Sequence, residues 1–234
     1  MRLEDIGGGL AVAQTPDFCF GTDALVLAAF GAPQKAGEKV CDLGTGCGII
    51  PFILQTRPHP PAYTLGVDIQ AEAIALCQTA KTQNGTKTIE FLQADWRDYA
   101  DMLPMGQFDR VLCNPPYFPK GSGKQNDSPA RKIARHADEN TLPCMCKAAA
   151  WTLRYGGKLC VCHRPSQLPD LFAAMRQNGL EPKRMRLVQQ RAEAAPFLVL
   201  VEAVKGGKEG LDVAVPWQLT DPQTHAYIYG AYSR

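Results

Sequence analysis

The chain has 234 residues, of which 45% are hydrophobic and 21% charged, and its 25 Lys and Arg residues nearly balance its 23 Asp and Glu residues. This composition is ordinary for a globular protein and excludes a long disordered region, a fibrous repeat and a strongly acidic or basic tail. The longest apolar runs, near Ala24–Phe30 and Phe197–Val201, are far shorter than the ~20 residues that span a bilayer, and the N-terminus has no secretion-signal pattern. We therefore expect no membrane association, and the net charge of +2, taken whole, argues weakly against a nucleic-acid partner.

The chain alternates apolar runs of strand length with helical patterns. A first helix is expected over Thr22–Phe30, where Thr22 or Asp23 is well placed as the N-cap. Strands are expected over 39–43, 63–67, 89–93, 108–113, 157–162, 183–189 and 196–204, and further helices over 48–57, 71–83, 142–154 and 166–178. The polar stretch 120–140 has no clear periodicity.

Strands that alternate with helices predict an α/β fold with a mostly parallel, seven-stranded sheet that is covered on both faces. The last two strands have no helix between them, so they should form a C-terminal antiparallel hairpin at one edge. We expect a single domain over residues 1–234, with an N-terminal extension (1–37), a core (38–204) and a C-terminal tail (205–234).

Nine cysteines are many for this length. Cys144-Met-Cys146 and Cys160-Val-Cys162 look like paired metal ligands, but zinc sites usually place Cys-x2–4-Cys in turn-rich loops. Alternation within a strand-like run would instead put Cys160 and Cys162 on the same face of the sheet. We expect buried thiols, no metal site and a reducing, cytoplasmic location.

The segment Val40–Gly48 is typical of a strand that carries an acid and ends in three alternating glycines, which open a helix. Gly44, Gly46 and Gly48, with Thr45 between them, let the backbone pass close to a ligand because no Cβ atom stands in the way. A tight strand–helix turn without a ligand is the structural alternative.

Three acids mark the expected carboxyl ends of three successive strands. They are Asp42, Asp68 with the adjoining Ile69, and Asp95 with the adjoining Trp96. In an open parallel sheet, such side chains point into the crevice where ligands bind. Asp68 is suited to accept both hydroxyls of a ribose, and Asp95 with Trp96 to hold an adenine.

Two cofactors compete for this site. NAD requires G-x-G-x-x-G with its pyrophosphate on the helix N-terminus, whereas Ile49 here occupies the position of the third glycine. S-adenosylmethionine carries no phosphate, and its cationic sulfonium and ammonium groups suit an acid-lined site. The three acids therefore favour S-adenosylmethionine, with S-adenosylhomocysteine as the product.

Asn114-Pro115-Pro116-Tyr117, after the fourth strand, is the most specific signal in the chain. The two prolines fix φ, remove N–H donors and leave a rigid arch of carbonyl acceptors. The Asn114 Oδ1 and the Pro115 carbonyl would each accept one N–H of an amine such as that of adenine, and would aim its lone pair at the sulfonium methyl. Tyr117 would stack on a flipped base. A proline-rich turn is the structural alternative.

Together these motifs resemble the amino-methyltransferases that use S-adenosylmethionine. The residues that carry the resemblance are Asp42-Leu-Gly-Thr-Gly46, Asp68, Asp95 and Asn114-Pro-Pro-Tyr-Phe118. Segments 18–30, 134–136, 181–185 and 201–206 are in addition similar to the bacterial tRNA1(Val) adenine-37 N6-methyltransferase family. The resemblance covers nearly the whole chain.

The resemblance implies a Rossmann-like class I methyltransferase fold and N6-methylation of adenine 37 in a tRNA of the tRNA-Val type. It also implies that Thr22 and Asp23 border the methionine end of the cofactor, although a plain helix cap is an equal alternative for Asp23. For His136 a solvated or structural role is favoured, and the tyrosine-rich segment 225–233 is expected to pack against the core.

Three other functions compete with this interpretation. Protein-glutamine N5-methyltransferases share the Asn-Pro-Pro-Tyr arch but carry a sizeable helical domain before the glycine turn, whereas only about forty residues precede Asp42 here. Guanine-N2 methyltransferases of ribosomal RNA share the fold and a similar arch, but phenylalanine is more usual at the position of Tyr117. A non-catalytic binding module is disfavoured by the intact arch and turn.

Two basic segments revise the first inference about nucleic acids. Lys120–His136 has five basic residues and one acid, and Lys183–Arg191 has four basic residues and no acid, so each carries +4 and the remaining chain −6. Such segments would bind RNA phosphates in a salt-dependent way; two solvated loops are the alternative. The residues expected to contact RNA are Tyr117, Phe118, Lys120, Lys124, Arg131, Lys132, Arg135, Lys183 and Arg184. We expect a cytoplasmic monomer that acts on tRNA without an obligate protein partner.

Overall fold

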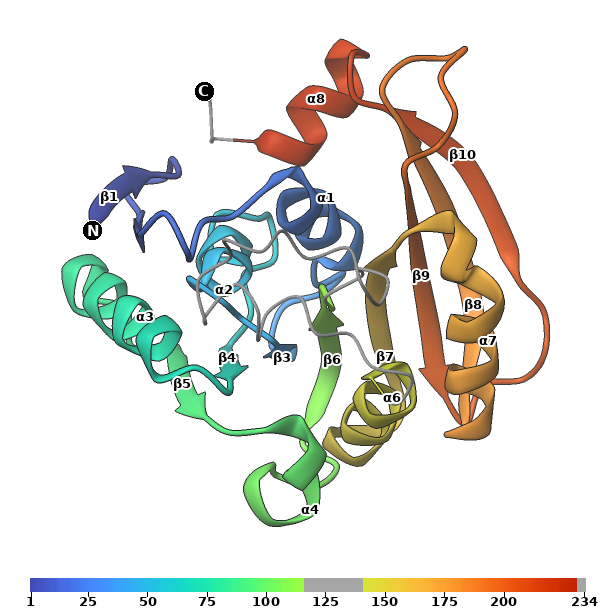
Figure 1. Ribbon diagram of the computed structural model, residues 1–234, viewed down its shortest axis with the longest axis horizontal. Helices are drawn as coiled ribbons and strands as arrows, with labels where there is room; N and C mark the ends of the chain where they lie inside the picture. The colour runs from blue at the N-terminus through green and yellow to red at the C-terminus, as the bar shows by residue number, and fades with distance from the viewer. Residues whose placement is uncertain (116–140, 231–234) are drawn as a thin grey trace, which may run out of the picture.

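An eight-stranded sheet forms the centre of the computed structural model, which describes residues 1–115 and 141–230 (Figure 1). Its strand order is β10-β8-β9-β7-β6-β3-β4-β5, and only β9 runs antiparallel to its neighbours. The strands are β3 (Lys39–Leu43), β4 (Tyr63–Asp68), β5 (Ile89–Gln93), β6 (Phe108–Cys113), β7 (Leu153–His163), β8 (Leu180–Gln189), β9 (Leu198–Lys205) and β10 (Asp212–Gln218). The parallel strands β3, β4 and β6 therefore end side by side at one edge.

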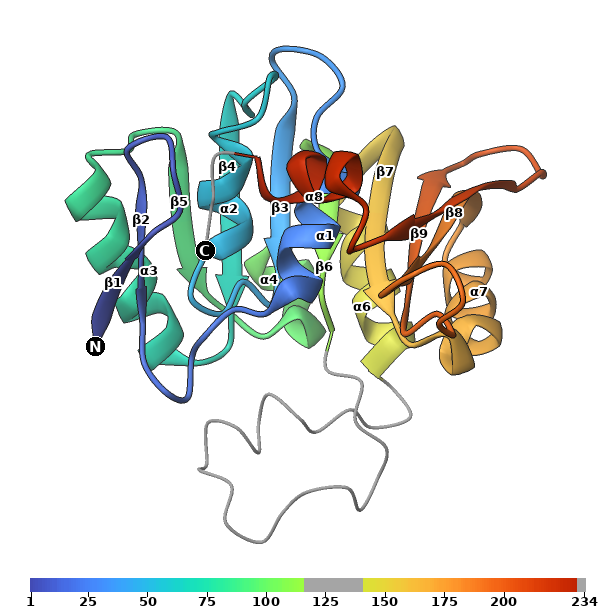
Figure 2. The same ribbon diagram turned by 90° about the horizontal axis from the view of Figure 1, so that it is seen from above.

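Helices cover both faces of this sheet (Figure 2). One layer contains α1 (Thr22–Gly31), α2 (Ile49–Leu54), α3 (Ala71–Asn84) and α8 (Pro222–Tyr229); the other contains α4 (Tyr99–Met102), α6 (Thr141–Thr152) and α7 (Leu168–Gln177). Short 3-10 turns, Trp96–Asp98 and Pro165–Gln167, precede α4 and α7. No helix in the described part of the chain is long and apolar enough to cross a membrane.

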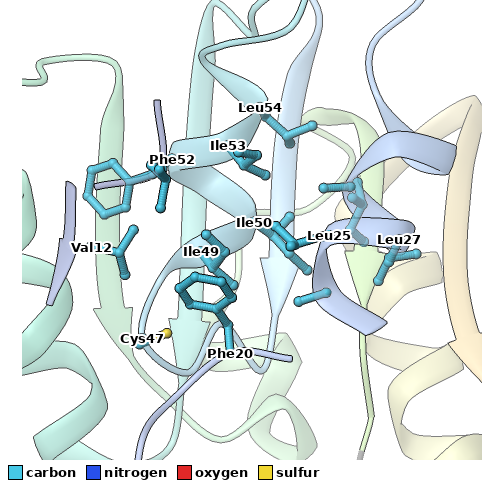
Figure 3. Packing of buried hydrophobic residues seen from close by; sticks show 14 of the residues in the cluster. Val12, Phe20, Leu25, Leu27, Cys47, Ile49, Ile50, Phe52, Ile53 and Leu54 are labelled. Atoms are coloured by element: carbon cyan, nitrogen blue, oxygen red, sulfur yellow. The ribbon is translucent and has the colours of Figure 1, made fainter. Parts of the chain in front are cut away.

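The helix that follows the glycine turn is apolar on every side. All the residues of α2, Ile49–Leu54, are buried between the sheet, α1 and the N-terminal segment (Figure 3). A helix without a polar face is stable in water only when it is covered all round. Burial of each large apolar side chain contributes roughly 1.5–3 kcal/mol, so this packing holds the preceding turn in place.

All seven predicted strands are present within four residues of their expected bounds, and the antiparallel pair β8–β9 is confirmed. This pair is not the edge of the sheet, because β10 adds an eighth strand outside β8. Most of β10 is exposed and it contains Pro216, so it lacks the alternation that marks a half-buried strand. The predicted helix 142–154 ends at Thr152, and the chain passes directly into β7.

The N-terminal extension contains a hairpin that the sequence analysis did not predict. β1 (Arg2–Asp5) and β2 (Ala11–Gln14) pair antiparallel as a separate small sheet. The side chain of Asn84, the last residue of α3, holds β2 at both backbone groups of Ala11: its Oδ1 accepts from the amide N–H (2.9 Å) and its Nδ2 donates to the carbonyl (2.7 Å). The hairpin is thereby fixed to the layer that contains α3.

A network of charged side chains lies inside the fold. Arg110 on β6, whose side chain is only 2% exposed, donates from Nε to Glu38 and from Nη1 to Glu202 on β9 (3.3 Å). Glu202 also accepts from Lys158 and Arg184, each at 3.1 Å. Among the described residues, Arg110 is the partner of Glu38, so the two buried charges depend on each other.

The C-terminal helix α8 packs on α1, as both ribbon views show (Figures 1 and 2). Arg57, just after α2, donates to the carbonyls of Tyr227 (2.7 Å) and Ile228 (2.5 Å), and the Tyr227 hydroxyl donates to the Ala29 carbonyl (3.4 Å). In the described part of the tyrosine-rich segment, Ile228 is buried and Tyr229 packs against the core as expected, whereas Tyr227 is 54% exposed. Asp221 followed by a proline at the first helical turn is a start signal that the sequence analysis overlooked.

Candidate active site

Three of the predicted site residues lie together at the carboxyl edge of the sheet. Asp42 on β3 pairs in register with Gly66 of β4 and with Leu112 of β6. Asp68 follows Gly66 by two residues, and Asn114 follows Leu112 by two residues. Because side chains two residues apart on a strand share a face, Asp42, Asp68 and Asn114 all lie on the side of the sheet that α1 and α2 cover.

The glycine turn is bonded to the end of β4. The amide N–H groups of Gly44 and Thr45 donate to the Val67 carbonyl (2.8 and 2.9 Å), and that of Gly46 donates to Asp68 Oδ2 (2.8 Å). Gly44, Gly46 and Gly48 all have positive φ, of 78°, 55° and 80°. A left-handed backbone at three alternating positions explains why glycine recurs there.

Replacing two of these glycines with alanine should have unequal effects on stability. Gly48→Ala is expected to cost about 2 kcal/mol or more, because a Cβ would lie 3.0 Å from Cys77 Sγ and 3.3 Å from Phe52 and Phe91, in addition to the strain at φ. Gly46→Ala meets nothing within 4 Å and should cost only the strain, about 1 kcal/mol. Urea denaturation of both variants measures the difference, and equal midpoints would contradict it.

Asp42 is a buried carboxyl group for which the described residues provide no hydrogen-bond partner. Neither of its oxygens, nor the Thr45 hydroxyl beside it, has a hydrogen-bond partner among the described residues. Burial and the nearby Asp68 carboxylate raise the pKa of Asp42 to about 7. The Thr45 hydroxyl is close enough to lower this pKa but does not reach hydrogen-bonding geometry. Orphaned buried oxygens are costly, so this site is suited to a ligand that brings positive charge or N–H donors.

Asp68 is held in place by the backbone. Its Oδ2 accepts from Gly46 N–H (2.8 Å) and its Oδ1 from Gln70 N–H (3.0 Å), which leaves one further acceptor site on each oxygen. Burial raises its pKa, against the lowering effect of these hydrogen bonds. The adjoining Ile69 side chain is 43% exposed, which is high for isoleucine and leaves an apolar surface next to the carboxylate.

Asp95 has a partner that the sequence analysis missed. The Arg97 side chain donates to both of its oxygens, from Nε at 3.0 and 2.8 Å and from Nη2 at 2.5 Å, and this pairing lowers the Asp95 pKa. Trp96 lies against the glycine turn, with an indole carbon 3.2 Å from where a Cβ on Gly44 would be. The signal in the sequence that could have indicated this ion pair is an arginine two residues after the acid at the end of a strand.

Asn114 directly follows β6, and its Oδ1 accepts a hydrogen bond from the thiol of Cys162 on β7 at 3.0 Å. Burial and then the Asp23 carboxylate raise the pKa of that thiol. Gly21 occupies the N-cap of α1 and Thr22 is its first residue, so the prediction of Thr22 or Asp23 as the cap is wrong.

The described part of the arch is Asn114 and Pro115, which is buried; Pro116 and Tyr117 lie outside the described residues. Seven of the nine cysteines are buried, and no group of three metal-binding side chains occurs among the described residues. Cys160 and Cys162 belong to the same apolar cluster, on the same face of β7, as expected from their alternation.

Comparisons with known proteins agree with this geometry. A family model described as "Methyltransferase domain" matches residues 34–198. The tRNA1(Val) (adenine(37)-N6)-methyltransferase of Bacteroides fragilis strain YCH46 is 30% identical over 77% of this chain and 75% of its own length. The chain belongs to this methyltransferase family.

Other matches extend the family assignment and the fold. The enzyme of the same name from Photobacterium profundum is 25% identical over 86% of this chain and 80% of its own length. The crystal structure of a predicted O-methyltransferase from Agrobacterium tumefaciens superimposes with a TM-score of 0.72 at 19% identity, covering 91% of this chain and 98% of that one. The fold is therefore that of class I methyltransferases that use S-adenosylmethionine.

Of the residues predicted to contact RNA, Lys183 and Arg184 belong to the part of the chain that the structure describes. Tyr117, Phe118, Lys120, Lys124, Arg131, Lys132 and Arg135 lie outside the described residues. Lys183 donates to the carbonyls of Lys208 (3.0 Å) and Glu209 (3.2 Å), and Arg184 bonds Glu202 and lies over the Phe30 ring at 4.0 Å. Both lie in the middle of β8, three inter-strand spacings, or roughly 14 Å, from β6.

Two exposed arginines lie at the same edge as Asn114 instead. Arg164 follows β7 and donates to the Phe197 carbonyl (3.2 Å), and Arg191 follows β8. Because β7 and β8 run parallel, both residues lie on the loops at the carboxyl edge. Their position directly after a predicted strand is the signal that the sequence analysis did not use.

Proposed function

We propose that this chain is an S-adenosylmethionine-dependent methyltransferase that methylates N6 of an adenine in tRNA, at position 37 of a tRNA of the tRNA-Val type. The observation that carries the proposal is Asn114 after β6, at the same sheet edge as Asp42, whose two carboxylate oxygens have no hydrogen-bond partner among the described residues. Family membership supports the reaction class, and the names of the relatives support the substrate.

The donor set fits the cofactor. Asp42 is proposed to face the cationic end of the ligand, Asp68 the ribose hydroxyls, and Ile69 and Trp96 the adenine ring, with Asp95 at its edge. The positive-φ glycines support this assignment, since they remove Cβ atoms from the turn that passes beneath the ligand. Thr22 and Asp23, at the start of α1, are proposed to border the methionine end. Bound there, S-adenosylmethionine supplies an electrophilic methyl group.

The arch is proposed to hold the target amine. Asn114 Oδ1 and the Pro115 carbonyl each accept one N–H of the adenine amine, and these hydrogen bonds strengthen as positive charge develops on the nitrogen. Each is worth roughly 1.5–3 kcal/mol, or about 10–100-fold in rate, and positioning of the two reactants supplies most of the rest. A strong general base is not required, because the proton becomes acidic only after transfer. Tyr117 is proposed to stack on the flipped base.

The ionisation of Asp42 should make cofactor affinity dependent on pH. Because the pKa of Asp42 is about 7 without ligand, protonation below that pH removes the charge that attracts a cation. S-adenosylmethionine should therefore bind roughly tenfold more tightly at about pH 7.5 than at about pH 6. Calorimetric titration at both pH values measures this ratio, and Asp42→Asn should bind more weakly with little pH dependence.

The stability of the ligand-free protein should change with pH in the opposite direction. The pKa of Asp42 is higher in the folded protein than its ordinary value of 3.8, so protonation favours the folded state. The contribution of protonated Asp42 to the free energy of unfolding is complete below the pKa of Asp42 in the unfolded chain. It is lost as the pH rises through the pKa in the folded protein, about 7. The wild type should lose more stability over this range than Asp42→Asn; a parallel decline in both proteins would contradict the pKa.

The tRNA contacts are proposed to lie on the loops at the carboxyl edge. The basic residues of 120–135 and the exposed Arg164 and Arg191 are the candidates nearest to this edge in the chain. Lys183 and Arg184 are proposed as contacts only for RNA that extends to the middle of β8. Binding through phosphates should weaken steeply as the salt concentration increases.

Methylation of total tRNA from a strain that lacks this gene tests the proposal. Nucleoside mass spectrometry should show N6-methyladenosine, and a tRNA-Val anticodon stem–loop with guanosine in place of adenosine 37 should accept no methyl group. Methylated guanosine as the product would indicate the guanine-N2 activity, and methyl groups found only in protein would indicate the glutamine-N5 activity. Light scattering of the same preparation tests our proposal that the protein is a monomer.

A further inference from the structure

The hydrogen bond from Cys162 to Asn114 suggests how the amide at the start of the arch is oriented. The last register pair between β6 and β7 joins Cys113 to Val161, so Asn114 and Cys162 are the next residues along the two strands. The Cys162 Sγ lies 3.0 Å from Asn114 Oδ1, and the cysteine is fully buried. On its other side, Cys162 pairs with Leu200 of β9, so its backbone is held in the interior of the sheet.

We propose that Cys162 is a positioning residue for methyl transfer: its thiol donates to Asn114 Oδ1 and thereby fixes which end of the amide faces the target amine. The inference rests on the proposed function, in which Asn114 Oδ1 accepts an N–H of adenine. A carbonyl oxygen has two lone pairs, so one can accept from the thiol while the other accepts from the substrate.

The surroundings favour the protonated thiol as the donor. Cys162 lies in an apolar cluster, and the carboxylates of Asp23 and Asp42 add negative charge nearby. Burial and these acids raise the thiol pKa well above its usual value, so the S–H proton is retained at neutral pH. Without this donor, the amide is free to turn its NH2 group toward the amine, and two N–H donors that face each other cannot form a hydrogen bond.

Substitutions at Cys162 separate the hydrogen bond from packing. Cys162→Ala and Cys162→Val both lack the donor, and the valine keeps most of the volume in case the alanine variant does not fold. Both should lower kcat about three- to tenfold, the range for one ordinary hydrogen bond, with KM for S-adenosylmethionine unchanged. Cys162→Ser retains a donor and should recover most of kcat.

Cys160→Ala is the matched control. Cys160 is also fully buried on the same face of β7, two residues earlier, but its thiol points to Glu202 (3.8 Å) rather than to Asn114. It should leave kcat unchanged. The proposal would be overturned if Cys162→Ala and Cys162→Val had the wild-type kcat. It would also be overturned if Cys162→Ser and Cys160→Ala lowered kcat as much as Cys162→Ala does.

Asn114→Ala distinguishes this inference from the proposed function. If it abolishes transfer while the Cys162 variants remain fully active, only the positioning role is wrong. If Asn114→Ala itself retains wild-type activity, the proposed mechanism fails and the role of Cys162 fails with it.

Discussion

Asn114→Ala is expected to lower kcat for tRNA methylation by about 100-fold or more and to leave affinity for S-adenosylhomocysteine nearly unchanged. The substitution removes an acceptor for the target amine at the stage when the nitrogen becomes positively charged, and such charge-assisted hydrogen bonds are worth roughly 1.5–3 kcal/mol. It also removes the side chain that orients the amine, and lost positioning adds to the rate decrease. The cofactor acids on β3 and β4 are untouched, so the product should still bind.

Single-turnover kinetics with saturating tRNA measure this effect without interference from product release. Asn178→Ala is a matched control, because the side-chain amide of Asn178, the C-cap of α7, donates to the Ala174 carbonyl (2.7 Å) rather than to the site. That variant should transfer methyl groups at the wild-type rate. If Asn114→Ala also reacts at the wild-type rate, Asn114 does not hold the amine.

Arg110→Ala should be the most destabilising change in the core, with an expected cost of about 3–5 kcal/mol. It leaves Glu38 buried without a partner among the described residues, whereas Glu202 keeps Lys158 and Arg184. For a chain of this size the melting temperature falls by roughly 2–4 °C per kcal/mol, so a decrease of roughly 6–20 °C is expected.

Arg154→Ala is the control for the loss of an arginine ion pair. Arg154 bonds Asp109 on the same strand as Arg110 (2.6 Å), but its side chain is 47% exposed. Exposed pairs contribute less than about 1 kcal/mol, so this variant should melt close to the wild type.

In a Glu38→Gln background the cost of Arg110→Ala should decrease, because glutamine needs no counter-charge. Equal melting temperatures for Arg110→Ala and Arg154→Ala would falsify the claim that the buried Glu38 depends on Arg110 for its counter-charge.

The sequence predicted those parts of the fold in which buried strands alternate with amphipathic helices. β9 follows a nearly continuous apolar run because a strand covered on both faces has no polar side, whereas β5 alternates and β8 carries basic residues between its apolar ones. Mostly exposed strands, such as β1 and β10, have no apolar pattern by which they could be recognised. β10 is recognised through its pairing with β8, and the β1–β2 hairpin through its attachment to Asn84. Neither contact can be read from the residues of the element itself.

The same limit applies to the site. Asp42 and Asp68 were identified because parallel strands end at a common edge, and Asn114 because it begins a specific four-residue motif. Arg184 was counted as a free charge, but it pairs with Glu202, which is 18 residues away. Cys162 is 48 residues from Asn114 and belongs to a different strand. Side-chain partners that are set by strand register become visible only when the register is known.

The attachment of α8 has a consequence for the order in which the protein assembles during synthesis. Arg57 and the carbonyl of Tyr227 are 170 residues apart, and the Tyr227 hydroxyl bonds Ala29 across 198 residues. A nascent chain that has already made the N-terminal half therefore keeps one apolar side of α1 uncovered until α8, Pro222–Tyr229, has been synthesised. Chains that stall before residue 222 should be preferred clients of chaperones, because they cannot close this surface.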